Sequence, residues 1–174
     1  MNTGLKLLRT AESLLEDPDQ RVKLNGSNES HLLHSIEVHS CHAAIATEAG
    51  DFNMSLEHFQ KGLDIFNQAL SMGYVHVDDA PHHILLGGIG NSLNGLGRNI
   101  EAEKAFLKCL NNKVSRTKFT PHEINICRTL LAQHKLQEAE RRLQEVINRR
   151  RQKFGPDDAQ SYLCLLYTSD AADE

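Results

Sequence analysis

Glycine is most concentrated in the stretch GGIGNSLNGLG, residues 87–97. Glycine-rich loops can bind phosphate because their backbone N–H groups approach the anion closely. A dinucleotide-binding loop needs a third glycine where Leu93 stands, and a P-loop needs lysine followed by serine or threonine where this chain has Leu96 and Gly97. Both patterns fail at residues that would carry the chemistry, so we expect no nucleotide or other cofactor here.

Histidine is the residue type that most suggests a metal, and the segment HLLHSIEVHSCH, residues 31–42, contains four of the ten histidines. On a helix, His31 and His34 are neighbours, and so are His39 and His42. The two pairs lie about 12 Å apart along the helix axis, which is too far for one ion. We therefore expect surface or partly buried histidines and no metal site.

Basic residues are concentrated in the run ERRLQEVINRRRQKF, residues 140–154. Glu138 with Arg142 and Glu145 with Arg149 have the favourable i, i+4 order, which predicts an ion-paired, solvated helix face. A nucleic-acid role for this run is an alternative that the net charge of −4 disfavours. No Ser/His/Asp or Cys/His grouping has a recognisable local spacing, so we expect that the chain is not an enzyme.

The composition indicates one ordinary domain, with 174 residues of which 40% are apolar. The four cysteines are scattered without a CxxC pair, which argues against a zinc knuckle or a disulfide scaffold. No apolar run is long enough for a signal peptide or a membrane-spanning helix. We expect a soluble cytoplasmic protein with no membrane partner, and a nuclear location is the alternative.

Apolar residues recur at helical spacing from Ser27 to Gly50, and again after Asp51 as far as Gly73, which predicts two amphipathic helices. Gly50 is expected to end the first helix in the left-handed conformation, and Gly73 to end the second. The predicted apolar residues are Leu32, Leu33, Ile36, Ala43 and Ala44 in the first helix, and Leu56, Phe59, Leu63, Phe66 and Leu70 in the second.

The same plan recurs twice more, after Pro81 and after Thr120, which is a candidate N-cap for a helix that starts at Pro121. Gly97 and His134 stand at the turns, and histidine tolerates positive φ better than most residues. The predicted apolar residues are Leu86, Ile89, Leu93 and Leu96; Ile100, Phe106, Leu107 and Leu110; Ile126, Leu130 and Leu131; and Leu136, Ala139, Leu143, Val146 and Ile147.

The third of these predicted helices runs straight through the glycine stretch. Each interior glycine costs about 0.5–1 kcal/mol relative to alanine, so packing has to supply the difference. We favour close packing of neighbouring helices over the alternative of a hinge or a shallow groove wall. Alanine at Gly87, Gly88 and Gly95 should stabilise a helix that is merely loose, and destabilise one whose backbone contacts require glycine.

Three segments share a pattern of turn and helix: EAGDFNMSLEHFQKGL, GLGRNIEAEKAFLKCL and AQHKLQEAERRLQEVI. They resemble the turn and second helix of tetratricopeptide repeats. In the second copy, Gly97, Ala102, Phe106 and Cys109 fit the family pattern, and Gly90 fits the small residue of the first helix. The third copy offers Ala139, Leu143 and Val146. The first offers Ser55, Phe59 and Gly62, with His39 and His42 at places where bulky apolar residues are usual.

Sequence at both ends resembles incomplete repeats. RRRQKFGPDD resembles the link between the long repeats of kinesin light chains and of sensor regions in signalling ATPases, with Asp157 or Asp158 as a helix cap. GLKLLRTAESLLEDP resembles a second helix that lacks its first. The tail CLLYTSDAADE, residues 164–174, resembles a translated sequencing adapter, so we assign residues 1–163 to one repeat domain.

The resemblance implies an all-α solenoid, a right-handed superhelix of antiparallel helix pairs that forms a truncated array. It also implies a scaffold that binds a protein or peptide on the concave surface formed by the first helices. Asn91, Asn94 and Arg128 are the expected binding residues and Glu48 a rim contributor, while Ala44 in the matching place of copy one argues against a complete polar clamp. The alternatives are a sensor fragment of a larger nucleotide-switch ATPase or other multidomain enzyme, and an RNA-binding repeat that uses Arg149, Arg150, Arg151 and Lys153.

Overall fold

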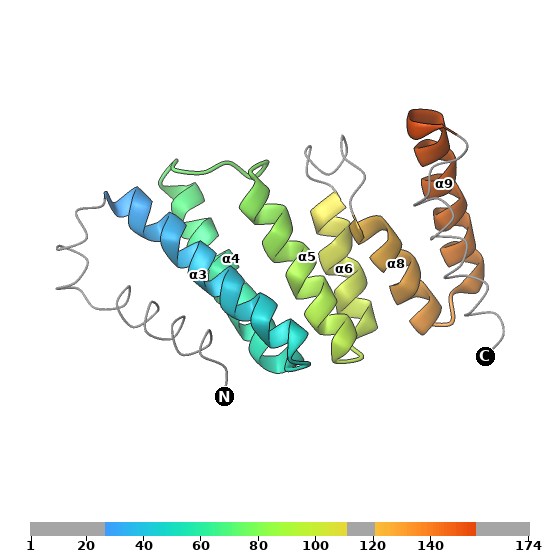
Figure 1. Ribbon diagram of the computed structural model, residues 1–174, viewed down its shortest axis with the longest axis horizontal. Helices are drawn as coiled ribbons and strands as arrows, with labels where there is room; N and C mark the ends of the chain where they lie inside the picture. The colour runs from blue at the N-terminus through green and yellow to red at the C-terminus, as the bar shows by residue number, and fades with distance from the viewer. Residues whose placement is uncertain (1–26, 111–120, 156–174) are drawn as a thin grey trace.

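A computed structural model describes residues 27–110 and 121–155, and every regular element in these ranges is an α-helix (Figure 1). The helices are α3 (Asn28–Glu48), α4 (Phe52–Ser71), α5 (Ala80–Gly95), α6 (Asn99–Leu110), α8 (Pro121–Ala132) and α9 (Leu136–Phe154). The predicted all-α fold is confirmed. Four predicted features lie outside the described residues: the N-terminal helix, the Thr120 cap, the cap at Asp157 or Asp158, and the tail at 164–174.

Local signals in the sequence determine where these helices begin. The side chain of Ser27 accepts a hydrogen bond from Ser30 N at 3.2 Å, and that of Asp51 accepts one from Met54 N at 3.0 Å. Each oxygen satisfies a backbone donor of the first turn that has no partner within the helix.

The predicted turn residues all have positive φ, at 76° for Gly50, 75° for Gly73, 72° for Gly97 and 58° for His134. Among the described residues, His134 is the non-glycine residue in this conformation. The predicted helix ends are therefore confirmed, including the turn for which a histidine replaces glycine.

Consecutive helices form antiparallel pairs that stack side by side (Figure 1). Each described helix packs against the next along the chain, and α5 also contacts both α3 and α8. Helices α3, α5 and α8 therefore form one layer, α4 and α6 form a second layer, and α9 packs against α8 at the end of the described array. This arrangement is the predicted stack of antiparallel helix pairs, in which each pair buries its apolar face against its neighbours.

One core cluster runs from α3 as far as Ala139 of α9, and a second, smaller cluster of Cys127, Leu143 and Ile147 lies between α8 and α9. The largest fully buried side chains include Phe66, Phe106, Ile36 and Leu85. Three predicted core residues are wrong, and the two largest are Ile100, which is 64% exposed, and Leu136, which is 61% exposed. Ile100 lies two residues before buried Ala102, which places it on the opposite side of a helix with about 3.6 residues per turn. Leu136 is the first residue of α9 and precedes the buried stripe. Ala44 is also exposed, although it was assigned to the apolar face of its helix.

Helix α5 runs through the whole glycine stretch to Gly95, and its glycines lie against rings from three other helices. A Cβ atom would overlap the ring of His122 at Gly87, of Phe59 at Gly88, of Phe106 at Gly90 and of Phe52 at Gly95. The close-packing interpretation is therefore confirmed at all four positions.

The surroundings of the ring over Gly87 favour its neutral form. Burial lowers the pKa of His122, and the neighbouring His83 lowers it further. An uncharged ring can pack against the backbone of α5 without the desolvation cost that an imidazolium would carry.

A chain of buried hydroxyl groups joins α3, α4 and α5. Thr47 Oγ1 lies 2.7 Å from Ser55 Oγ, which lies 2.8 Å from Ser92 Oγ, and Ser92 donates to the carbonyl of Gly88 at 2.9 Å. Ser55 and Ser92 are completely buried. Small polar residues thus allow three helices to approach closely while their polar atoms stay paired.

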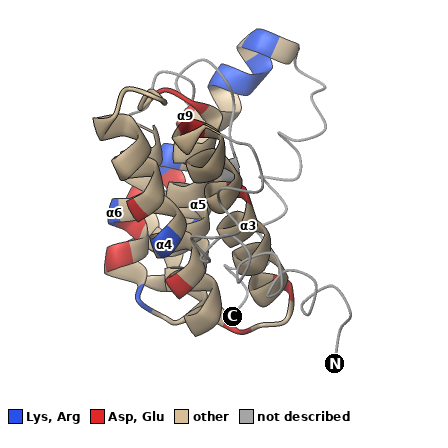
Figure 2. Cartoon of the chain, turned by 90° about the vertical axis from the view of Figure 1, so that its left-hand side faces the viewer, with Lys and Arg blue, Asp and Glu red and all other residues tan. Residues whose placement is uncertain are grey.

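Helix α9 carries the ion-paired face that the sequence predicts. Arg142 pairs with Glu138 at 2.8 Å, as expected. Hydrogen bonds from Arg141 and Arg142 lower the pKa of Glu138 to about 2. The predicted pair of Glu145 with Arg149 is wrong, because Glu145 pairs with Arg141, and Arg149 pairs with the nearly buried Glu123 of α8. Basic residues remain gathered at the C-terminal end of α9 (Figure 2).

Candidate functional site

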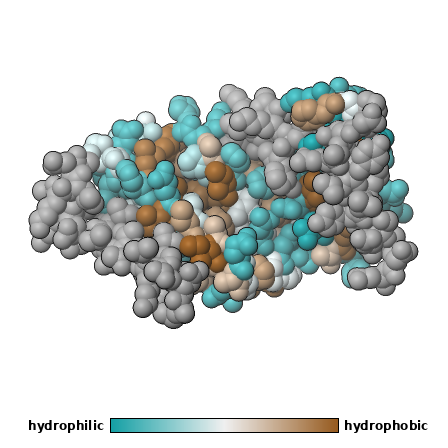
Figure 3. All heavy atoms as spheres, in the orientation of Figure 1, coloured by the Kyte–Doolittle hydropathy of each residue, from teal (hydrophilic) through white to brown (hydrophobic). Residues whose placement is uncertain are grey.

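An open groove of about 500 Å³ lies where α5 faces α8, and it is the site that best fits the sequence predictions. Figure 3 shows that hydrophilic residues gather in this part of the visible face. Nine residues line the groove: Thr47, Phe52, Asn91, Asn94, Gly95, Asn99, Asn125, Arg128 and Ala132.

The groove brings together three of the four predicted binding residues, Asn91, Asn94 and Arg128. The fourth, Glu48, is the exposed last residue of α3 and does not line the groove, although its neighbour Thr47 does. Asn91 and Arg128 are both exposed, whereas Asn94 is half-buried. The two exposed side chains are therefore the more accessible to a ligand.

Two carboxamides of α5 connect it to α8. Asn91 Oδ1 accepts a hydrogen bond from Asn125 Nδ2 at 2.8 Å. Asn94 Nδ2 donates to Thr129 Oγ1 at 2.7 Å, and that hydroxyl in turn donates to the carbonyl of Asn125 at 2.7 Å. Since Thr129 is 1% exposed, the bond from Asn94 is a structural link as well as part of the groove wall.

Asn94 and Asn91 should therefore differ in their effect on stability. Asn94→Ala should lower the free energy of unfolding by about 1 kcal/mol, because it leaves the buried Thr129 hydroxyl without that donor. Asn91→Ala should change it by less than about 0.5 kcal/mol, since both members of its pair are accessible to water. Urea denaturation measures both changes in the free energy of unfolding. If the two variants lose the same free energy, the hydrogen bond from Asn94 to Thr129 does not stabilise the fold more than the bond between Asn91 and Asn125.

The sequence did not single out Asn125, Phe52 or Asn99 as groove residues. Asn125 lies one helical turn before Arg128, just as Asn91 lies one turn before Asn94, so the shared spacing was a usable signal. Phe52 comes from the start of α4, and its ring lies where a side chain at Gly95 would otherwise stand. The absence of a Cβ at that glycine thus makes room for an aromatic edge to the groove.

The chemistry of the groove suits a peptide. Asparagine carboxamides both donate and accept hydrogen bonds, which matches the alternating groups of a peptide backbone. Among the described residues that line the groove, Arg128 is cationic and none is acidic. A guanidinium can bind a carboxylate through two parallel hydrogen bonds.

The sequence comparisons support the same class of fold. A family model described as tetratricopeptide repeat matches residues 125–160, a span that begins at groove residue Asn125 and includes Arg128 and all of α9. No curated protein and no solved structure matches the chain significantly. Within the described ranges, none of the helices has the length and apolar character needed to cross a membrane. Repeats of this family generally mediate protein–protein interaction, and they are typically not enzymes.

Proposed function

We propose that this chain is a scaffold that binds a peptide or protein segment in the groove between α5 and α8. The observation that carries the proposal is the set of lining residues: four asparagines and Arg128, with no acidic residue, in an open groove on the α3/α5/α8 layer. The match of the α8/α9 segment to a family of protein-binding repeats supports it.

The groove residues have distinct roles in this proposal. Asn91 retains N–H donors for the ligand backbone, since its oxygen is the atom that accepts from Asn125. Arg128 binds a carboxylate of the ligand, either an acidic side chain or a free C-terminus. Asn94 holds α5 against α8 through its bond to Thr129 and so positions the groove wall. Glu48, which lies at the rim outside the groove, contributes to binding there. The occupant is therefore an extended acidic segment, and the protein would act in the cytoplasm or nucleus.

Selection from a random-peptide library on the immobilised full chain tests the proposal. The selected peptides should be enriched in aspartate, glutamate or a free C-terminal carboxylate. Their affinities, measured by fluorescence anisotropy, should fall at least about tenfold with Arg128→Glu, because the change replaces an ion pair with like-charge repulsion. Asn91→Ala should weaken binding less, through the loss of a neutral hydrogen bond.

Matched variants on the other layer provide the control. Gln60→Ala on α4 and Lys104→Glu on α6 make the same kinds of change at exposed residues outside the groove. They should leave peptide affinity unchanged. Peptides that bind the Arg128→Glu variant as tightly as the wild type, or that respond only to Lys104→Glu, would contradict the proposed site.

The RNA-binding alternative finds less support in the contacts of α9. Arg149 is paired with Glu123, and Arg150 is 8% exposed with its guanidinium 5.3 Å from the ring centroid of Phe154. These arginines contribute to the packing of α9, so they are poorly placed to serve mainly as phosphate contacts. The sensor-region alternative stays a prediction, and it is compatible with a peptide groove.

A further inference from the structure

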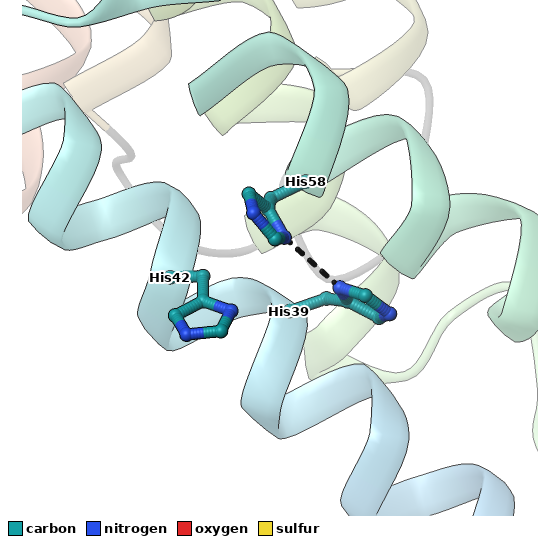
Figure 4. Close-up of side chains that lie close together, drawn as sticks. All are labelled: His39, His42 and His58. Carbon is teal, nitrogen blue, oxygen red and sulfur yellow. Dashed lines mark hydrogen bonds between the residues drawn. The ribbon is translucent and has the colours of Figure 1, made fainter. Parts of the chain in front are cut away.

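Three histidines converge between α3 and α4. His39 and His42 lie one turn apart on α3, and His58 reaches toward them from α4 (Figure 4). One ring nitrogen from each residue lies within 4.8 Å of the others. The ring centroids of His58 and His42 are 4.6 Å apart, and those of His58 and His39 are 5.3 Å apart. The expectation of no metal site rests on the histidines of residues 31–42 alone, whereas the third histidine of this cluster, His58, comes from the facing helix α4.

Packing of α3 against α4 does not require imidazole rings at the positions of His39, His42 and His58. Counted from the turn glycines Gly50 and Gly97, the three histidines occupy the same positions as Leu86, Ile89 and Ala105 in the next helix pair. Those three residues are at most 8% exposed and supply ordinary apolar packing. In the first pair, His39 and His42 are also buried, at 8% and 3% exposed, but they bring polar ring nitrogens into the interior. Because histidine stands at all three of these apolar positions in the first pair, we infer that the three histidines act together.

The geometry is close to that of a metal site. Zinc binds histidine nitrogen at about 2.0–2.1 Å, so two ligands of a tetrahedral ion lie about 3.3 Å apart. The Nδ1 atoms of His39 and His58 are 3.1 Å apart. Gly62 of α4 lies beside this point, and a Cβ there would be in ordinary van der Waals contact with the Cβ of His39 at 3.6 Å. The ligand nitrogens of all three rings lie within 4.8 Å of one another, so a shift of the His42 ring toward the other two would complete a three-nitrogen set.

We propose that His39, His42 and His58 bind a divalent transition-metal ion, with Zn²⁺ as the favoured ion and water as its fourth ligand. Three neutral imidazoles favour zinc and its neighbours over Mg²⁺ or Ca²⁺, which prefer oxygen ligands. The hydrogen bond between the two Nδ1 atoms requires a proton on one of them. Zinc takes the Nδ1 lone pair of both rings, so the ring that carried its proton on Nδ1 gives that proton to solvent and takes one up on Nε2. Both rings stay neutral, and no net proton is released.

The ion would cross-link α3 to α4, the helix pair that contributes Thr47 and Phe52 to the groove. Because the unfolded chain does not hold the three nitrogens together, zinc binding stabilises the folded state. The metal site does not depend on the peptide groove, and either proposal can fail without the other.

The test uses the full chain, stripped of metal with a chelator that is then removed. Titration with Zn²⁺ against a chromogenic competitor should show one ion per chain. At a free Zn²⁺ concentration about a hundred times the Kd, Tm should rise by about 5 °C or more. Co²⁺ should bind in the same place and give the intense visible absorption of a four-coordinate ion.

Three glutamine variants and one control identify the ligands. His39→Gln, His42→Gln and His58→Gln should each weaken Zn²⁺ binding at least about tenfold and remove the cobalt absorption. His34→Gln, an exposed position on α3, should change neither. His58 is half-buried, so the His58 variant is the one expected to keep the fold, which circular dichroism verifies. The proposal is overturned if the wild type binds no stoichiometric zinc, if the folded His58 variant binds it as tightly, or if His34→Gln removes binding.

Discussion

Alanine at both Gly88 and Gly90 destabilises the array by roughly 2–4 kcal/mol, against the usual rule that alanine stabilises a helix interior. Alanine gains about 0.5–1 kcal/mol of helix propensity per site. That gain is smaller than the cost of overlap, because the added Cβ atoms would meet the buried rings of Phe59 and Phe106. The two rings come from different helices, α4 and α6, so the two costs should be nearly additive.

Urea denaturation of the double variant and of each single variant measures this effect. Gly95→Ala is the matched control on the same helix, and its change should stay within about 1 kcal/mol, because half-buried Phe52 can turn away toward solvent. A double variant as stable as the wild type would mean that α4 and α6 are not held this close to α5.

Arg149→Met should lower the free energy of unfolding by about 1–2 kcal/mol. It removes the cation from Glu123, whose side chain is only 10% exposed, and a carboxylate without its partner is costly in such a place. The value falls below that for a fully buried pair because the Arg149 side chain is 53% exposed and water can replace part of the interaction.

A second substitution shows whether the lost stability comes from the unpaired charge. Glu123→Gln in the Arg149→Met background should restore part of the stability, since a neutral amide is less costly to bury. Arg141→Met is the control on the same helix, and it should cost at most about 0.5 kcal/mol because Glu138 and Glu145 are more exposed. If the Arg149 and Arg141 variants lose the same free energy of unfolding, the ion pair between Arg149 and Glu123 does not stabilise the packing of α9 against α8.

The helices and their ends could be predicted because the relevant signals are local. Ser27 and Asp51 cap helices through bonds to residues three positions away, and Gly97 and His134 end helices through their own φ angles. The apolar spacing through the glycine stretch was likewise sufficient to identify α5 as a helix and not a phosphate loop.

Contacts between helices could not be predicted in the same way. The bond from Asn94 to Thr129 and the approach of His58 to His39 join residues whose positions depend on how neighbouring helices are offset and rotated. Ile100 shows the same limit, since its exposure depends on its rotation relative to Ala102 and not on its own hydrophobicity. Family resemblance identified the face of α5 that carries Asn91, but not its partner Asn125.

A crystal structure of the full chain with one of the selected acidic peptides tests the central claim most directly. The peptide should lie in the groove between α5 and α8, with a carboxylate on the guanidinium of Arg128 and backbone hydrogen bonds to Asn91. A peptide bound to the α4/α6 layer, or to the arginines at the end of α9, would contradict the proposed binding site.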